Sequence, residues 1–236
     1  MSLIQSILRG PRAPWPVYAA PIGLAAVLAA LVGVQPWVTP DVLFRDPMSV
    51  AGGEPYFGLV SNLGILVWAA AASICLFAGF QLRRNGGDPL HAGFLLWSGV
   101  ITATLLLDDL FLLHEVVYLS LFGLHETVLF AGYATLIAIY LVRYRNTITD
   151  FDPLLLGAAL AMFAISIFFD KLTGPRAPGI IDAHPALHFI QPFVTWINPA
   201  ATLLEDGPKL AGILVWATYL IRAAWQALCG TPQVGR

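Results

Sequence analysis

The sequence predicts an all-α integral membrane protein built as a bundle of six transmembrane helices. Three observations point to this class. The chain of 236 residues is 58% hydrophobic and only 11% charged, whereas an ordinary soluble domain is about a quarter charged. Long uncharged runs recur along it, each near the ~20 apolar residues that a membrane-crossing helix needs. The net charge of −2, without a basic patch, argues against a disordered or nucleic-acid-binding chain.

The first two expected spans lie in long uncharged runs. Residues 16–38 fall within a run of 28 uncharged residues, 13–40. Basic residues precede this run, as in a signal peptide. No convincing A-x-A cleavage site follows it, so we predict a retained first helix. The second span, 56–82, occupies the uncharged stretch between Glu54 and Arg83.

The next three expected spans are residues 92–116, 126–142 and 153–170. The first of them contains Asp108 and Asp109 with apolar residues on both sides. We therefore expect the helix to pass through both aspartates rather than to stop before them. The other two are shorter apolar runs, separated by a polar segment.

The sixth expected span, 200–224, buries charge. Only twelve residues separate Lys209 from Arg222, and about 18 Å of helix cannot cross a hydrocarbon core of about 30 Å. Asn198 as the N-cap, with Pro199 at the first helical position, favours an early start. The helix then includes Glu205, Asp206 and Lys209, and the segment 171–198 forms an outer loop.

The basic residues predict the orientation. Eight of the twelve fall on one side of the predicted bundle: Arg9, Arg12, Arg83, Arg84, Arg143, Arg145, Arg222 and Arg236. The positive-inside rule places that side, with both termini, in the cytoplasm. The expected location is a bacterial inner (plasma) membrane. Most acids and histidines fall on the opposite side, an asymmetry that the insertion rule does not explain.

One helix is predicted to carry a polar stripe. His91, Ser98, Thr102 and Asp109 lie at offsets of 0, 7, 11 and 18 residues. At about 100° per residue they point within about 20° of one direction. Ionisable residues at such depth are costly and usually face a bundle interior or a water-filled cavity.

The outer ends of the expected helices gather carboxylates and imidazoles, a donor set that suits a divalent metal such as zinc. The expected ligands are Asp109, His114, His125 and Asp206. The expected acid–base and charge-stabilising residues are Asp108, Glu115, Glu126, Glu205 and Lys209. A metal with an open position lowers the pKa of its bound water. The leading prediction is therefore a metal-dependent hydrolase with an outward-facing site, acting on a lipid-like substrate from the membrane.

Two other classes of function stay open. Acids and a lysine inside a bundle also describe a proton- or cation-coupled transporter or channel. The same charges could instead be interface pairs of a non-catalytic subunit of a membrane complex. Small hydroxyl residues commonly serve only to pack membrane helices. The pair His184 and His188 has metal-ligand spacing if it is helical, which is a weak signal on its own.

Overall fold

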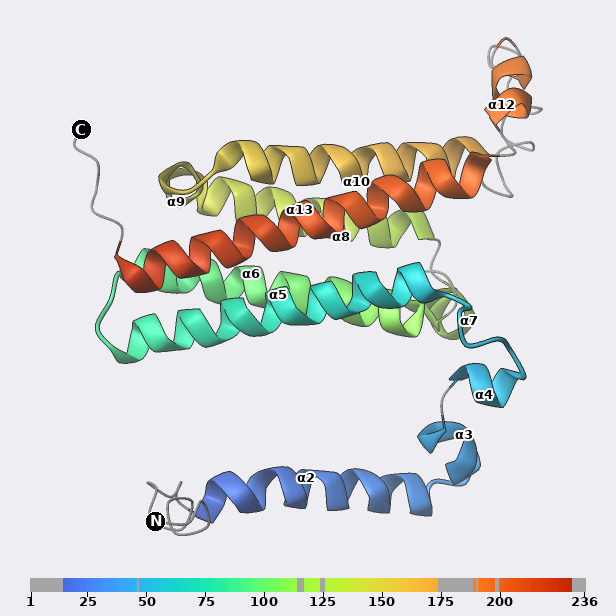
Figure 1. The fold of residues 1–236 in the computed structure, drawn as a ribbon, viewed down its shortest axis with the longest axis horizontal. Coiled ribbons are helices and arrows are strands. Elements are labelled where there is room, and N and C mark those ends of the chain that lie inside the picture. The colour runs from blue at the N-terminus through green and yellow to red at the C-terminus, as the bar shows by residue number, and fades with distance from the viewer. Residues whose placement is uncertain are drawn as a thin grey trace, which may run out of the picture. The chain divides into compact units, whose positions relative to one another are not determined.

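The computed structural model describes residues 15–45, 47–113, 117–123, 126–173, 189, 191–197 and 200–230. Every regular element within these ranges is a helix, which confirms the predicted all-α class (Figure 1). The chain divides into two compact units, Met1–Leu59 and Val60–Arg236.

The first unit contains α2 (Trp15–Val34), α3 (Pro40–Phe44) and α4 (Pro47–Ala51). The side chain of Gln35 caps the carboxyl end of α2. Its Oε1 accepts hydrogen bonds from the backbone N–H groups of Trp37 (2.9 Å) and Val38 (3.0 Å). Its Nε2 donates to the carbonyl of Val32 at 3.2 Å, which satisfies a carbonyl of the last helical turn.

The second unit begins with a tight helical hairpin, α5 (Leu59–Arg84) and α6 (Pro89–Phe111). Gly86 has a positive φ of 70°, and the N–H of Gly87 donates to the carbonyl of Leu82 at 2.8 Å. This is the left-handed glycine ending that helices commonly use. Asp88 caps α6 by accepting from the N–H of Leu90 at 3.0 Å, and Pro89 occupies the first helical position.

The described residues of the second unit form six further helices: α7 (Tyr118–Phe122), α8 (Glu126–Arg143), α9 (Arg145–Asp150), α10 (Pro153–Thr173), α12 (Gln191–Ile197) and α13 (Ala201–Cys229). The α5–α6 connection, α9 and the carboxyl end of α13 lie at one end of this bundle (Figure 1). Helix α7 and the amino end of α13 lie at the other, which we call the Asp109 end after the residue discussed below.

Within the described part of the chain, four helices are long and apolar enough to cross a membrane: α5, α6, α10 and α13. Two shorter apolar stretches, Pro21–Val34 in α2 and Val128–Arg143 in α8, coincide with the remaining expected spans. The described residues therefore fit a multi-pass integral membrane protein.

Glycines allow close helix contacts in the bundle. A Cβ on Gly99 of α6 would lie 2.7 Å from Cγ of Leu76 on α5, and one on Gly79 would lie 2.7 Å from Cγ of Leu96. On α13, a Cβ on Gly212 would lie 2.8 Å from the ring of Phe163 on α10. Small residues at these positions let the helix backbones approach closely, as is typical of membrane helix pairs.

Candidate functional site

The structure describes five of the predicted site residues. Asp108 and Asp109 lie in the last turn of α6, and Glu205, Asp206 and Lys209 lie in the first turns of α13. The predictions for His114, Glu115 and His125 fall outside the described residues. Glu126 begins α8, but its side chain is outside the described part as well. His184 and His188 also fall outside it.

An ion pair between Asp109 and Lys209 joins α6 to α13. The two atoms Oδ1 and Nζ are 2.8 Å apart, and the side chains are 15% and 38% exposed. The second oxygen of Asp109 accepts a hydrogen bond of 3.1 Å from the indole Nε1 of Trp68 on α5. Each carboxylate oxygen therefore has a donor from a different helix. This partner of Lys209 lies 100 positions earlier in the chain. The pairing of Lys209 with Glu205 or Asp206, which their spacing along α13 predicts, stays a prediction.

This pair lies at one end of α6 but well inside its neighbours. Asp109 is two residues from the end of α6 at Phe111. Lys209 and Trp68 are eight and nine residues from the starts of α13 and α5, which is about 12–14 Å of helix. Helix α6 therefore ends at the level of the ion pair, while α5 and α13 continue for more than two turns beyond it.

The neighbouring Asp108 is buried, with 5% of its surface exposed. Tyr133 of α8 forms a side-chain hydrogen bond with it, so the first half of α8 lies against the end of α6. Directly afterwards α6 ends at Leu112, which adopts the left-handed conformation (φ 49°), and its N–H donates to the carbonyl of Asp108. The two adjacent aspartates thus face different partners, one a phenol and the other an ammonium and an indole.

The predicted polar stripe of α6 is confirmed by its contacts. The two hydroxyl residues of the stripe, Ser98 and Thr102, each contact a different helix. Thr102 accepts a hydrogen bond of 3.0 Å from the indole of Trp216 on α13. Ser98 lies 2.7 Å from the hydroxyl of Tyr140 on α8 and also donates to the carbonyl of Phe94 at 2.7 Å. Ser98 and Thr102 are both fully buried.

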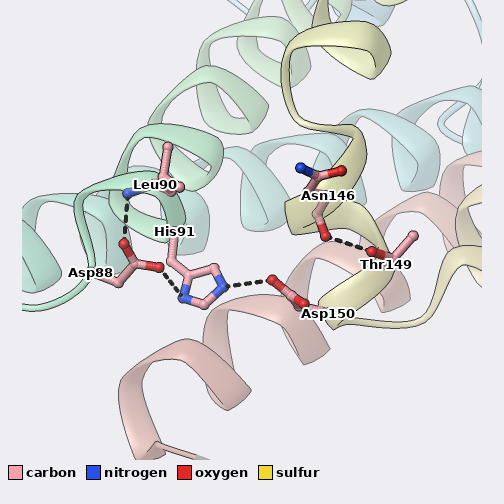
Figure 2. Close-up of polar contacts among 6 residues, drawn as sticks. All are labelled: Asp88, Leu90, His91, Asn146, Thr149 and Asp150. Atoms are coloured by element: carbon pink, nitrogen blue, oxygen red, sulfur yellow. Dashed lines mark hydrogen bonds and ion pairs between the residues drawn. The ribbon is translucent and has the colours of Figure 1, made fainter. Parts of the chain in front are cut away.

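At the other end of the stripe, His91 lies between two carboxylates (Figure 2). Its Nδ1 is 3.0 Å from Oδ2 of Asp88, and its Nε2 is 3.5 Å from Oδ2 of Asp150 on α9. These side chains are 28–45% exposed. A histidine with a carboxylate on each ring nitrogen links the start of α6 to the end of α9.

Aromatic rings fill the bundle between Ser98 and His91. Phe94 stacks on Tyr140 and Phe151 and meets Tyr144 and Tyr219 edge-on, with ring centroids 5.5–6.3 Å apart. Tyr144 follows α8, and its burial raises the pKa of its phenol above the ordinary value, although the guanidinium groups of Arg143 and Arg83 act in the opposite direction. The fully buried hydroxyl of Tyr219 has no hydrogen-bond partner among the described residues.

The described residues contain no group of three or more His, Cys, Asp or Glu side chains placed to hold a metal ion. Two of the four expected ligands, His114 and His125, are outside that part of the chain. The sequence did not predict Trp68 and Trp216 as polar partners, because a tryptophan within an apolar run is ordinarily assigned to the hydrophobic core. The only available signal was that a buried tryptophan N–H usually finds an acceptor.

The chain was compared with known proteins. A protein-family model described as "Domain of unknown function (DUF8692)" matches residues 19–223. No curated protein matches the chain, and no solved structure does.

Proposed function

Because the chain belongs to the DUF8692 family of unknown function, we propose a function from the geometry of its polar contacts. The protein is an integral membrane protein that moves a proton or a small cation across the bilayer, with Asp109 as the binding carboxylate. The observation that carries this proposal is the ion pair between Asp109 and Lys209 within a bundle of apolar helices.

The proposed topology has six spans, in which α2 and α8 join the four longer helices. Both termini lie in the cytoplasm, the segment 171–198 lies outside, and the membrane is a bacterial inner (plasma) membrane. The arginines of the sequence support this orientation by the positive-inside rule.

Charge balance suggests how the pair works. The Lys209 ammonium compensates the Asp109 carboxylate, because an uncompensated charge at this depth is costly. A proton or a cation that binds Asp109 neutralises it instead and releases Lys209. The pair therefore has two states that differ by one positive charge: in one the ammonium compensates the carboxylate, and in the other the bound ion does and the ammonium is displaced. The lysine is thus an internal competitor of the transported ion.

Helix α13 offers further oxygen atoms beside Lys209. Pro208 lies within the helix, and because proline has no N–H, the carbonyl of Leu204 loses its ordinary helical donor. Glu205 and Asp206 lie in the same turns. A polarised carbonyl near carboxylates is a suitable surface for a passing cation, so we assign Glu205 and Asp206 to the entrance of the path.

The test is ion flux in proteoliposomes. The purified full-length protein is reconstituted with a pH-sensitive dye inside, and a potassium gradient with valinomycin supplies the driving potential. We expect dye-reported proton movement in the wild type and its loss in Asp109→Asn. Asp170→Asn is the matched control, because Asp170 also pairs with a lysine, Lys171, at 2.7 Å, but with its sequence neighbour at the end of α10.

Equal flux in wild type, Asp109→Asn and protein-free vesicles contradicts proton transport. The same vesicles loaded with sodium or potassium and a matching indicator then test cation transport. If Asp109→Asn leaves both fluxes unchanged, Asp109 is not the binding carboxylate.

A second candidate is the metal-dependent hydrolase with a lipid-like substrate. The contact between Tyr133 of α8 and Asp108 of α6 favours it, since it brings the helix that follows His125 against the helix that precedes His114. Asp109, His114, His125 and Asp206 would hold the metal, with Asp108, Glu115 and Glu126 available for proton transfer. Metal analysis of protein purified with and without chelator tests this candidate: a stoichiometric zinc that is lost in His114→Ala and His125→Ala supports it, and metal-free protein of unchanged stability contradicts it.

A further inference from the structure

His91 lies between two carboxylates that belong to different elements. Asp88 directly precedes α6, where one of its oxygens caps the N–H of Leu90 and the other lies 3.0 Å from Nδ1 of His91. Asp150 is the last residue of α9, and its Oδ2 lies 3.5 Å from Nε2. Figure 2 shows the imidazole ring between the two side chains. Within the described part of the chain, these two aspartates are the ion-pair partners of His91.

The doubly protonated ring suits this arrangement, and the neutral ring does not. A neutral imidazole carries one N–H, so its other nitrogen presents a lone pair, which a nearby carboxylate repels. The imidazolium cation has an N–H on both nitrogens and attracts both carboxylates. When the ring loses one proton, the other stays on the side of the closer aspartate, Asp88. The contact with Asp150 is therefore the one that depends on the second proton.

The neighbouring elements bring further charges to this end of the bundle. They are Arg83 and Arg84 at the end of α5, Arg143 at the end of α8, Arg145 at the start of α9, Asp152 after α9 and Arg222 in α13. The phenol of Tyr144 stays neutral near pH 7, because its burial raises its pKa. The arginines and the amino end of α6 disfavour a positive ring. The arginines are exposed and screened by salt, whereas the two carboxylates are in direct contact with the ring.

Helix α9 covers the aromatic residues at this end of the bundle. Its Thr147 and Ile148 are buried, and Phe151, which follows it, stacks on the fully buried Phe94 with ring centroids 5.5 Å apart. The helix has six residues and no side-chain cap at its amino end, so its own hydrogen bonds cannot hold it in place. A lone Asp150 at its carboxyl end is also disfavoured by the helix dipole. The position of α9 therefore depends on packing and on the contact with His91.

We propose that His91 is a pH-dependent link between α6 and α9. At low pH the imidazolium bridges Asp88 and Asp150 and holds α9, together with Phe151, over Phe94. As the pH rises, the ring loses its second proton, the attraction to Asp150 is lost, and α9 separates from α6 more often. The link does not depend on ion transport, because it lies at the end of the polar stripe opposite Asp109.

Hydrogen–deuterium exchange of the full-length protein in detergent micelles tests this link. Exchange of the α9 amides is measured from about pH 5 to pH 8, the range in which histidine ordinarily changes its charge. Each rate is compared with the intrinsic exchange rate at the same pH, which gives a protection factor. We expect the protection of α9 to fall by about two- to fivefold over this range, as the loss of a partly exposed ion pair allows. Protection in the middle of α13, around Trp216, should stay constant.

Two variants remove the link. In His91→Gln and in Asp150→Asn, the protection of α9 should stay at every pH near the level that the wild type has at about pH 8. The matched control is Asp152→Asn, because Asp152 lies two residues beyond Asp150 but accepts from the N–H of Leu155 at 3.3 Å. This control should keep the pH dependence of α9.

Constant protection of α9 across the pH range in the wild type overturns the proposal. A pH dependence that persists in His91→Gln overturns it as well, since another group would then be responsible. A folding defect in a variant would lower the protection around Trp216 too, and the pH series of the wild type then decides alone.

Discussion

At Asp109, two donors of different kinds share one carboxylate. The ammonium of Lys209 brings a charge, and the indole of Trp68 brings only a dipole. Replacing Lys209 leaves the aspartate with the indole alone, whereas replacing Asp109 leaves a partly exposed lysine. The two halves of the pair are therefore not equivalent, and the aspartate depends more on the lysine than the reverse.

We expect Lys209→Met to destabilise the protein by about 1–3 kcal/mol, between the values for exposed pairs and for fully buried ones. Adding Asp109→Asn should restore most of the loss, because Asp109 then no longer carries an uncompensated charge. Thermal or denaturant unfolding in detergent measures both variants. Lys171→Met, which breaks the pair at the end of α10, is the control and should change stability by less than about 1 kcal/mol. No loss in Lys209→Met would mean that water already compensates Asp109.

Two buried tyrosines provide a matched comparison of hydroxyl groups. The hydroxyl of Tyr140 is bonded to Ser98 at 2.7 Å, whereas that of Tyr219 has no partner among the described residues. Tyr140→Phe should cost about 1 kcal/mol, the ordinary net value of a hydrogen bond. Tyr219→Phe should cost nothing or stabilise the protein, because it removes an unsatisfied buried polar group. A loss of similar size in both variants would contradict this distinction.

At the scale of elements, the α5–α6 hairpin depends on close backbone approach. A Cβ on Gly99 would meet Leu76 at 2.7 and 2.8 Å, and the Leu76 backbone nitrogen at 3.1 Å. Gly99→Ala should therefore destabilise the protein by about 1–3 kcal/mol through overpacking. In Gly132→Ala on α8, nothing lies within 4 Å of the added Cβ. This substitution should leave the stability unchanged or raise it, because alanine has a higher helix propensity than glycine. The free energies of unfolding of Gly99→Ala and Gly132→Ala, measured under identical conditions, test this prediction.

The start of α6 depends on Asp88, whose carboxylate has two roles. One oxygen caps the N–H of Leu90, and the other lies 3.0 Å from His91. Asp88→Ala should cost about 1 kcal/mol and speed amide exchange in the first turn of α6. Asp150→Ala, which removes the contact of α9 with His91 and leaves the Asp88 cap in place, should speed exchange in α9 and leave the first turn of α6 protected. Protection in α9 that does not change in Asp150→Ala would show that the histidine does not hold that helix.

The periodicity of the sequence was sufficient to predict the helices and the polar stripe, but it was not sufficient to predict which residues pair between helices. The hydrophobic runs predicted helices near all six expected spans, because burial in lipid requires such runs. The offsets of His91, Ser98, Thr102 and Asp109 predicted a shared face. That Lys209 would reach Asp109 could not be predicted, because contacts between helices 100 residues apart depend on packing, which the glycines of α5, α6 and α13 control and which no local spacing encodes.

For the whole molecule, native cysteines allow the proposed orientation to be tested with few changes. Cys75 is fully buried in α5, and Cys229 is exposed at the end of α13. In intact cells an impermeant maleimide should leave the wild type unlabelled until the membrane is permeabilised, since Cys229 is on the proposed cytoplasmic side. The variant Ala186→Cys/Cys229→Ser should label without permeabilisation. The opposite result for both proteins would invert the topology.

The separation of Asp109 and Lys209 along the chain has a consequence for biosynthesis. Translation proceeds at about 5–20 residues per second, so α6 exists for roughly 5–20 s before the ribosome reaches Lys209. During that interval the α5–α6 hairpin is in place and Trp68 is available, but the counter-charge of Asp109 is not. Insertion of α13 is thus the step that supplies the positive charge of Lys209, which compensates Asp109. A chain that stops before α13 retains the Asp109 carboxylate between apolar helices without the ammonium that pairs with it in the full chain.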